Sequence, residues 1–161
     1  MTEKKSPKPG QNRRKSRELA LKGLYSLLLS ESDLQETIQD MTEDADYSRA
    51  DAEYFKRLLV GVMAERAALD LRIAPLLDRK LAELSPVEHG ILYIAGYELL
   101  HDLSIPYRVA INEGVELAKL YGGTDGHKFV NGVLDKLAAQ ARPEEVRQVA
   151  RPGRKSGINQ T

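Results

Sequence analysis

Four cationic side chains lie close together near the amino end of the chain: Arg13, Arg14, Lys15 and Arg17. At about 100° per residue of helix, the three arginines share a sector with the leucines at positions 21, 24 and 28. One face therefore changes from apolar to cationic and is expected to project its arginines beyond the core. A guanidinium fits phosphate with a rigid fork of donors and stacks on bases, which indicates RNA contact. The alternative is a solvated, frayed helix end, although the helix dipole disfavours cations there.

The second group that could bind an anion is the turn YGGTDGHKF at residues 121–129. Its glycines precede a predicted helix whose free backbone N–H groups suit a phosphate, and His127 and Lys128 add donors. Phe129 lies about 90° from the apolar stripe of that helix, so its ring is expected at the rim, where a base can stack on it. The alternative interpretation is a C-capping glycine pair with Asp125 as an N-cap and Phe129 as edge packing.

Catalysis and metal binding find little support in the sequence. There is no cysteine, and the three histidines, His89, His101 and His127, lack the spacing of metal ligands. Neither a nucleophile elbow nor a dinucleotide-binding fingerprint is present, and the glycines at 122 and 123 do not match a P-loop. We therefore expect no enzymatic activity, no metal and no cofactor.

The elements that must position these groups are predicted to be helices. Apolar residues such as Leu21, Leu24, Tyr25 and Leu28 recur with helical spacing, whereas strand-like alternation is almost absent. Ser85 followed by Pro86 is a clear helix start, with serine as N-cap and proline in the first turn. Seven helices are expected, at about 13–28, 34–41, 55–71, 76–84, 86–99, 106–121 and 126–137. Their short connections predict an all-α fold of two small packed bundles.

Charge is unevenly distributed although the formal net charge is zero. Residues 1–22 carry +6, residues 141–161 carry +3, and the part between them carries −9. Basic ends beside an acidic body suit nucleic-acid contact through counterion release, while a merely solubilising role is the alternative. Proline, glycine and lysine predict disordered arms at 1–12 and 142–161. The domain between them, 13–141, is expected to divide into an N-terminal bundle ending near residue 80 and a C-terminal bundle from about 81.

The leucine-rich run at residues 19–29 follows a basic start and so resembles a secretory signal. Lys22 interrupts the run and no small-residue cleavage site follows, so we interpret it as a core helix. No apolar stretch approaches the roughly 18 residues that a membrane span requires, and a cytoplasmic, membrane-free protein is expected.

Three segments resemble the NusB transcription antitermination family: RRKSRELALKGLYSLL at 13–28, LSPVEHGILYIAGYELL at 84–100 and IPYRVAINEGVELAKLYGGTDGHKFVNGVLDK at 105–136. The third is the most specific, and the resemblance covers about 13–140. It implies a seven-helix fold of two bundles. It further implies binding of the boxA element of ribosomal RNA leaders, jointly with NusE, a small-subunit ribosomal protein. That assembly helps RNA polymerase resist termination.

The resemblance also implies roles for particular residues. The family's arginine-rich motif falls on Arg13, Arg14, Lys15 and Arg17, with lysine at a position that is often arginine. Its acidic and aromatic positions fall on Asp125 and Phe129, beside His127 and Lys128, and Glu88 matches a position on the NusE-facing surface. Both candidate sites found from the residues thus coincide with the RNA site that the resemblance implies.

Two other functions are weighed beside this one. The first is the NusB-like domain that precedes the catalytic domain of some RNA cytosine methyltransferases. The catalytic part of such an enzyme requires well over a hundred residues in addition to the 161 present. The second is a structural homodimer that covers the arginine motif.

Overall fold

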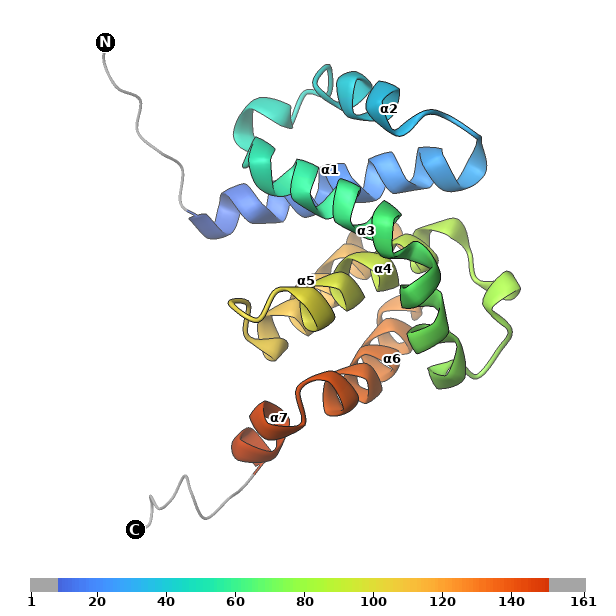
Figure 1. Cartoon of the computed structure of the whole chain (residues 1–161), viewed down its shortest axis with the longest axis vertical. Helices are drawn as coiled ribbons and strands as arrows, with labels where there is room; N and C mark the ends of the chain where they lie inside the picture. Colours follow the sequence, from blue (N-terminus) through green and yellow to red (C-terminus); the bar gives the residue numbers. More distant parts are fainter. Residues whose placement is uncertain (1–8, 151–161) are drawn as a thin grey trace.

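The computed structural model describes residues 9–150, and within this range every regular element is helical (Figure 1). The α-helices are α1 Pro9–Leu29, α2 Leu34–Met41, α3 Ala52–Ile73, α4 Pro86–His101, α5 Tyr107–Tyr121, α6 Gly126–Ala141 and α7 Pro143–Ala150. The expected all-helical fold with seven α-helices is confirmed for this part of the chain, although α7 was not among the expected helices and the one expected at 76–84 is absent. The expected arm at 1–12 is shorter in the structure, because α1 begins at Pro9. Residues 1–8 and 151–161, the outer parts of both predicted arms, lie outside the described range.

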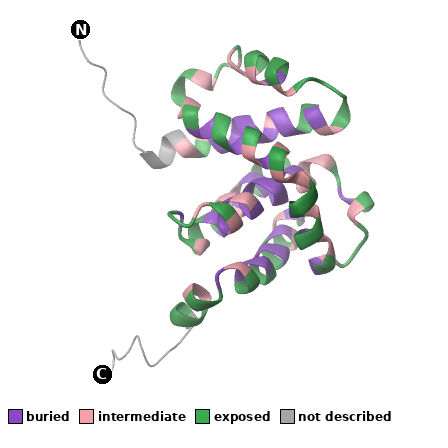
Figure 2. Ribbon diagram, viewed as in Figure 1, coloured by how far each residue is buried: buried purple, intermediate pink, exposed green. Residues whose placement is uncertain are grey.

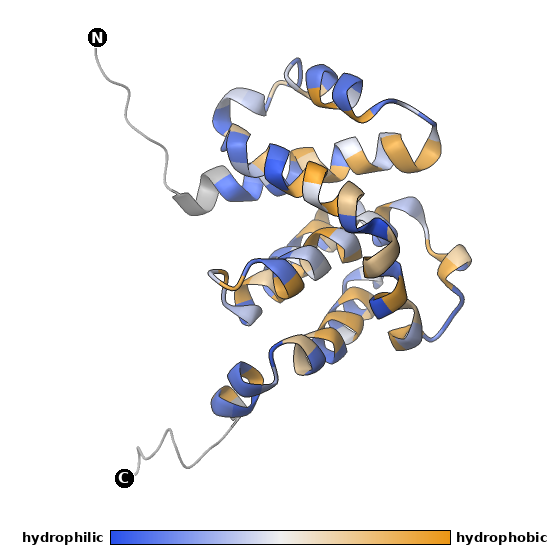
Figure 3. Cartoon of the chain, viewed as in Figure 1, coloured by the Kyte–Doolittle hydropathy of each residue, from blue (hydrophilic) through white to orange (hydrophobic). Residues whose placement is uncertain are grey.

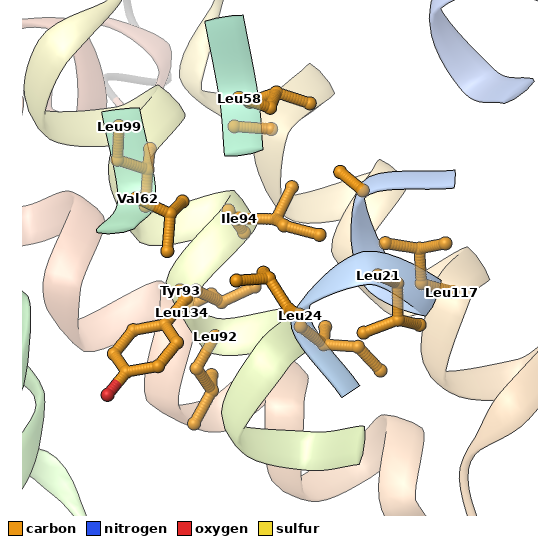
Figure 4. Packing of buried hydrophobic residues seen from close by; sticks show 14 of the residues in the cluster. Leu21, Leu24, Leu58, Val62, Leu92, Tyr93, Ile94, Leu99, Leu117 and Leu134 are labelled. Atoms are coloured by element: carbon orange, nitrogen blue, oxygen red, sulfur yellow. The ribbon is translucent and has the colours of Figure 1, made fainter. Parts of the chain in front are cut away.

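Two layers of helices share one hydrophobic core. Helix α1 packs against α2 and α3 in one bundle and against α4 of the other, while α4, α5 and α6 pack on each other. Figure 4 shows the junction, where Leu21 and Leu24 of α1 meet Leu58 of α3 and Ile94 of α4. Burial is concentrated on the facing sides of these helices, and α2 is mostly exposed (Figure 2). A contiguous core therefore fixes the position of α1 against both bundles.

The leucine-rich run of α1 is a core element, as expected, and hydropathy is highest on its C-terminal half (Figure 3). Leu19, Leu21 and Leu24 are at most 3% exposed. Tyr25, which was expected on the same inner stripe, is 44% exposed and lies off it. No helix among the described residues is long and apolar enough to cross a membrane.

Side chains of the preceding residues cap the first turns of α4 and α3. The Ser85 hydroxyl accepts a hydrogen bond from the backbone N–H of Glu88 at 3.1 Å, and Pro86 occupies the first turn of α4, as the sequence predicts. Asp51 caps α3 in the same way by accepting from the N–H of Tyr54. These caps satisfy backbone donors that the first helical turn leaves free.

The prediction of a helix at 76–84 is wrong. The structure has two single 3₁₀ turns there, Ala74–Leu76 and Leu81–Glu83, joined by residues 77–80, of which Leu77 and Lys80 are extended and the two between them form a bend. Pro75 cannot continue the backbone hydrogen bonding of α3, and the extended backbone of Leu77 and Lys80 interrupts any helix before α4 begins at Pro86. The loop 77–80 that results carries Arg79.

The prediction that the chain is disordered from residue 142 onward is also wrong for the first residues of this segment. Arg142 is 6% exposed, and its guanidinium donates to the backbone carbonyls of Leu99 at 2.8 Å, Asp102 at 3.1 Å and Glu98 at 3.2 Å. These carbonyls lie at and just after the end of α4, where helical partners run out. Those of Glu98 and Asp102 also accept from the backbone N–H groups of Asp102 and Ile105, so Arg142 is a second donor to them. Pro143, which suggested a helix break, instead occupies the first turn of α7.

Glu145 of α7 completes this junction. One of its carboxylate oxygens accepts from Arg142 at 2.7 Å and the other from the backbone N–H of Tyr107 at 2.8 Å. The Arg142 and Glu145 side chains thus bind the end of α4 and the start of α5 together. The hydrogen bonds to Tyr107 and Arg142 lower the pKa of Glu145 against the opposing effect of burial.

Candidate nucleic-acid interface

The four cations near the amino end occupy different environments on α1. Arg13 is half-buried, and its guanidinium carbon lies 4.2 Å from the centre of the Tyr54 ring, in a cation–π contact. Lys15 is also partly covered, 3.6 Å from carboxylate oxygens of both Glu18 and Asp46. Both remain charged groups at the edge of the molecule, but neither extends freely into solvent.

Arg14 is the most exposed of the three arginines, with a side chain 51% accessible. Its Nε and Nη2 donate to the two carboxylate oxygens of Glu113 at 3.1 and 2.9 Å, a two-point pairing that joins α1 to α5. The same carboxylate raises the pKa of Arg14. A phosphate approaching Arg14 therefore competes with Glu113 for the same fork of donors.

Arg17 does not project from the core, contrary to the sequence prediction. It is 4% exposed, and its Nε donates to Glu98 Oε2 of α4 at 2.7 Å. The hydroxyl of Tyr54 donates to the same oxygen, and Glu113 lies 3.6 Å from the Arg17 Nη1. Arg17 is one turn closer than Arg13 to the crossing of α1 with α4, which places it under the neighbouring helices. In this structure it anchors the cationic segment rather than presenting itself to a ligand.

Glu98 is the acidic centre of this buried group. It is 1% exposed, and burial raises the pKa of its carboxyl, against the lowering effects of Arg17 and Tyr54. Burial and the negative charge of Glu98 likewise raise the pKa of Tyr54. The guanidinium of Arg13 lies over the ring of Tyr54, so the buried pair of Arg17 and Glu98 positions the half-buried Arg13 through the tyrosine and holds α1 in place.

A cavity of about 570 Å³ lies beside Arg14, between α1 and α5. Its walls mix both signs of charge with apolar side chains: Arg14, Lys15, Glu18, Arg49, Glu113, Glu116, Leu117 and Leu120. Three carboxylates and three cations line it, so its interior offers no net attraction to phosphate.

The turn after α5 has a backbone conformation that explains part of its sequence. Gly122 accommodates a tight C-terminal turn, because an added Cβ would lie 2.7 Å from the carbonyl oxygen of Ala118. Asp125 adopts φ 64°, in the left-handed region, and its side chain makes no capping hydrogen bond. Asp125 thus occupies the N-cap position of α6, as the alternative interpretation expects, but its side chain does not cap the helix. Its exposed carboxylate lies 3.5 Å from the Lys128 Nζ instead.

Phe129 lies at the rim of α6, as predicted, half-buried and packed against the core. Sequence reasoning missed its neighbour: the guanidinium carbon of Arg79 lies 3.9 Å from the centre of the Phe129 ring. Lys128 beside it is exposed, and His127 is half-buried. The turn thus presents a stacked arginine and ring next to a lysine.

Glu88 lies at the same turn rather than on a separate surface. Its Oε2 is 3.4 Å from the point where a Cβ on Gly126 would stand. A small apolar hollow of about 270 Å³ adjoins it, lined by Leu21, Lys22, Tyr25, Val87 and Tyr121. The hollow includes the exposed Tyr25, which faces outward from α1.

The two cationic clusters are separate but connected. The arginine cluster contacts α5 at Glu113 and the turn follows Tyr121, eight residues later, which corresponds to about 12 Å along the helix. The Tyr121 hydroxyl donates to Glu18 of α1 at 3.1 Å, so α1 and the turn are held to each other. Burial and Glu18 together raise the pKa of Tyr121 to about 12. The structure thus brings the predicted residues to one side of α5 without forming a single pocket.

Comparison with known proteins identifies the family of this chain. The family model described as "NusB family" matches residues 14–139. The chain belongs to the NusB family. The NusB protein of Methylobacillus flagellatus, a transcription antitermination protein, is 63% identical over 142 residues, covering 88% of this chain and 92% of its own. The one from Bordetella pertussis is 54% identical over 143 residues, covering 86% and 93%.

Solved NusB structures have the same fold. T. maritima NusB is 32% identical and superimposes with a TM-score of 0.72, covering 84% of this chain and 96% of that one. A structure of the antitermination factors NusB and NusE in complex with dsRNA is 25% identical, with a TM-score of 0.69 over 79% of this chain and 96% of that one. Among the described residues of this chain, no group of three histidine, cysteine or acidic side chains could hold a metal ion.

Proposed function

We propose that this protein is a cytoplasmic transcription antitermination factor that binds the boxA element of ribosomal RNA leader transcripts together with NusE. In this role it makes RNA polymerase less prone to termination, as a binding protein and not as an enzyme. The observation that carries the proposal is the 63% identity over 142 residues to a transcription antitermination protein. The exposed cations on α1 and the aromatic turn at α6 supply the chemistry that RNA binding requires.

On this proposal the cations have different tasks. Arg13, Arg14 and Lys15 contact phosphate at the rim of the α1–α5 cavity, and Arg17 positions them from below. The turn, with Asp125, His127, Lys128 and Phe129, engages an unstacked base and its phosphate.

Replacement of Arg14 by alanine is expected to weaken binding to boxA-like and scrambled RNA alike. A phosphate contact carries no sequence information, and its loss from a single strand lowers the slope of log affinity against log salt by roughly 0.7. Fluorescence anisotropy over a salt series measures this slope. Arg147→Ala is the matched control, because Arg147 also pairs with a glutamate but lies on α7. An unchanged salt slope for Arg14→Ala would remove Arg14 from the RNA face.

NusE is proposed to dock beside Glu88, where the apolar hollow at Tyr25 and Val87 offers a contact for its side chains. Glu88→Lys is expected to weaken the complex by one to several kcal/mol, because reversal of a close interfacial charge leaves like charges facing each other. Isothermal titration calorimetry with purified NusE measures the change. Glu65→Lys, the same reversal on α3, serves as control. Equal affinities for Glu88→Lys and the control would show that this surface is not the interface.

A homodimer that covers the arginine motif is the competing arrangement at rest. Sedimentation over a range of protein concentrations, with and without RNA, distinguishes the two arrangements. If a dimer covers the arginine motif, RNA shifts the protein toward the monomer. If the protein is a monomer at rest, RNA does not change its self-association.

A further inference from the structure

Arg79 brings a cation from outside the recognised segments onto the aromatic turn. It lies in the loop 77–80, between the 3₁₀ turns Ala74–Leu76 and Leu81–Glu83, fifty residues before Phe129 in the chain. Its guanidinium carbon stands 3.9 Å from the centre of the Phe129 ring, the distance of a stacked contact. The irregular loop that replaces the expected helix is what allows this approach.

The guanidinium is held in orientation and keeps most of its donors free. Its Nε donates to Asp78 Oδ1 at 2.8 Å, and within the described part of the chain this is its one hydrogen-bond partner. The side chain is 36% exposed. The hydrogen bond to Asp78 raises the pKa of Arg79, and the charges of Asp78, Glu88 and Glu83 act in the same direction. Arg79 therefore presents a permanently charged plane whose terminal N–H groups can bind a ligand.

Phe129 cannot offer its ring to a ligand in the way that an isolated aromatic does. The ring packs against the core, and the guanidinium takes its solvent side. A base that arrives at this site meets the guanidinium first. Arginine planes support base stacking as aromatic rings do, and they add donors for base edges and phosphate.

We propose that Arg79 is an RNA-binding residue that forms the middle layer of a stack, with an unpaired base on one side and Phe129 on the other. The inference deepens the proposed RNA function and rests on it. The ring holds the guanidinium flat, Asp78 sets its rotation, and the free terminal nitrogens bind the phosphate or edge of the same nucleotide.

The test uses the full chain with NusE and a boxA-like single strand, compared with a scrambled strand. Arg79→Ala is expected to weaken binding to the boxA-like strand about tenfold, within the range of one lost stacked base. Arg79→Lys keeps the charge but not the plane, so it is expected to recover less than half of this loss on a logarithmic scale. Phe129→Ala is expected to cost a similar factor, and adding Arg79→Ala to it should weaken binding by no more than about twofold further, because both groups serve one base.

Other outcomes overturn the inference in identifiable ways. Tighter binding by Arg79→Ala would show that the arginine covers Phe129 and is displaced by RNA. Unchanged binding would show that Arg79 takes no part, and full recovery by Arg79→Lys would show a point charge without stacking. If the unaltered protein binds the boxA-like and scrambled strands equally, the proposed function fails. If it discriminates between them and Arg14→Ala weakens binding while Arg79→Ala does not, only the present inference fails.

Discussion

Replacement of Arg17 by alanine is expected to lower the free energy of unfolding by about 3–5 kcal/mol, because it leaves the buried carboxylate of Glu98 without its cation. Arg17 is 4% exposed, and its Nε donates to Glu98 at 2.7 Å. Urea unfolding followed by circular dichroism measures the change. RNA affinity per folded molecule is expected to fall as well, since α1 loses the contact that holds Arg13 and Arg14 in place.

Two control variants distinguish a buried anchor from an exposed RNA contact. Arg14→Ala removes a half-exposed ion pair and is expected to cost less than about 1 kcal/mol of stability. The double variant Arg17→Met, Glu98→Gln removes both charges, keeps an acceptor for the Tyr54 hydroxyl and is expected to regain most of the stability lost in Arg17→Ala. If Arg17→Ala were as stable as Arg14→Ala and still lost RNA binding, Arg17 would be an exposed contact, as the sequence alone suggests.

Arg142→Ala is expected to have the second-largest effect, about 3 kcal/mol. The substitution removes a buried cation that donates to three backbone carbonyls at and after the end of α4, and a hydrogen bond to a charged group contributes about 1.5–3 kcal/mol. The carbonyls of Glu98 and Asp102 keep a backbone donor, so the main loss is expected at Leu99. Residues from 143 onward should then become sensitive to limited proteolysis, because Glu145 loses its partner as well.

Arg147→Ala, on the same helix, provides the comparison. Its guanidinium pairs with Glu144 at the surface, so its loss is expected to change stability by no more than about 0.5 kcal/mol. Arg142→Lys tests the geometry, since a single ammonium cannot replace a planar fork that reaches three acceptors. Equal stability of Arg142→Ala and Arg147→Ala would mean that α7 is not docked as described.

The helices that could be predicted are those with a strong local signal. The apolar spacing of the first helix and the Ser85–Pro86 start of α4 depend on neighbours within a few residues. Both are confirmed, except that Tyr25 lies off the buried stripe. The prediction for 76–84 was wrong because Pro75 ends α3 and Leu77 and Lys80 adopt extended backbone, an interruption that the apolar spacing does not show. Arg142 and Pro143 resembled a break because the carbonyls that hold Arg142 lie about forty residues earlier.

The candidate site could likewise be predicted only where the signal is local. Arg13, Arg14 and Arg17 fall in one broad sector of a helical projection, and the position of α4 determines which of them is buried. One signal was available: Glu98 is an acidic residue within a strongly apolar helix, which requires a buried partner. Arg79 could not be assigned to Phe129, because a loop without periodic pattern brings them together from fifty residues apart.

The binding of a boxA-like single strand, a scrambled strand and a duplex of the same sequence, each with and without NusE, tests the account most directly. Anisotropy at fixed salt is the readout. We expect the boxA-like single strand to bind at least tenfold more tightly than the scrambled one when NusE is present, with a smaller difference in its absence. Equal affinity for both single strands in the presence of NusE would contradict the proposed function.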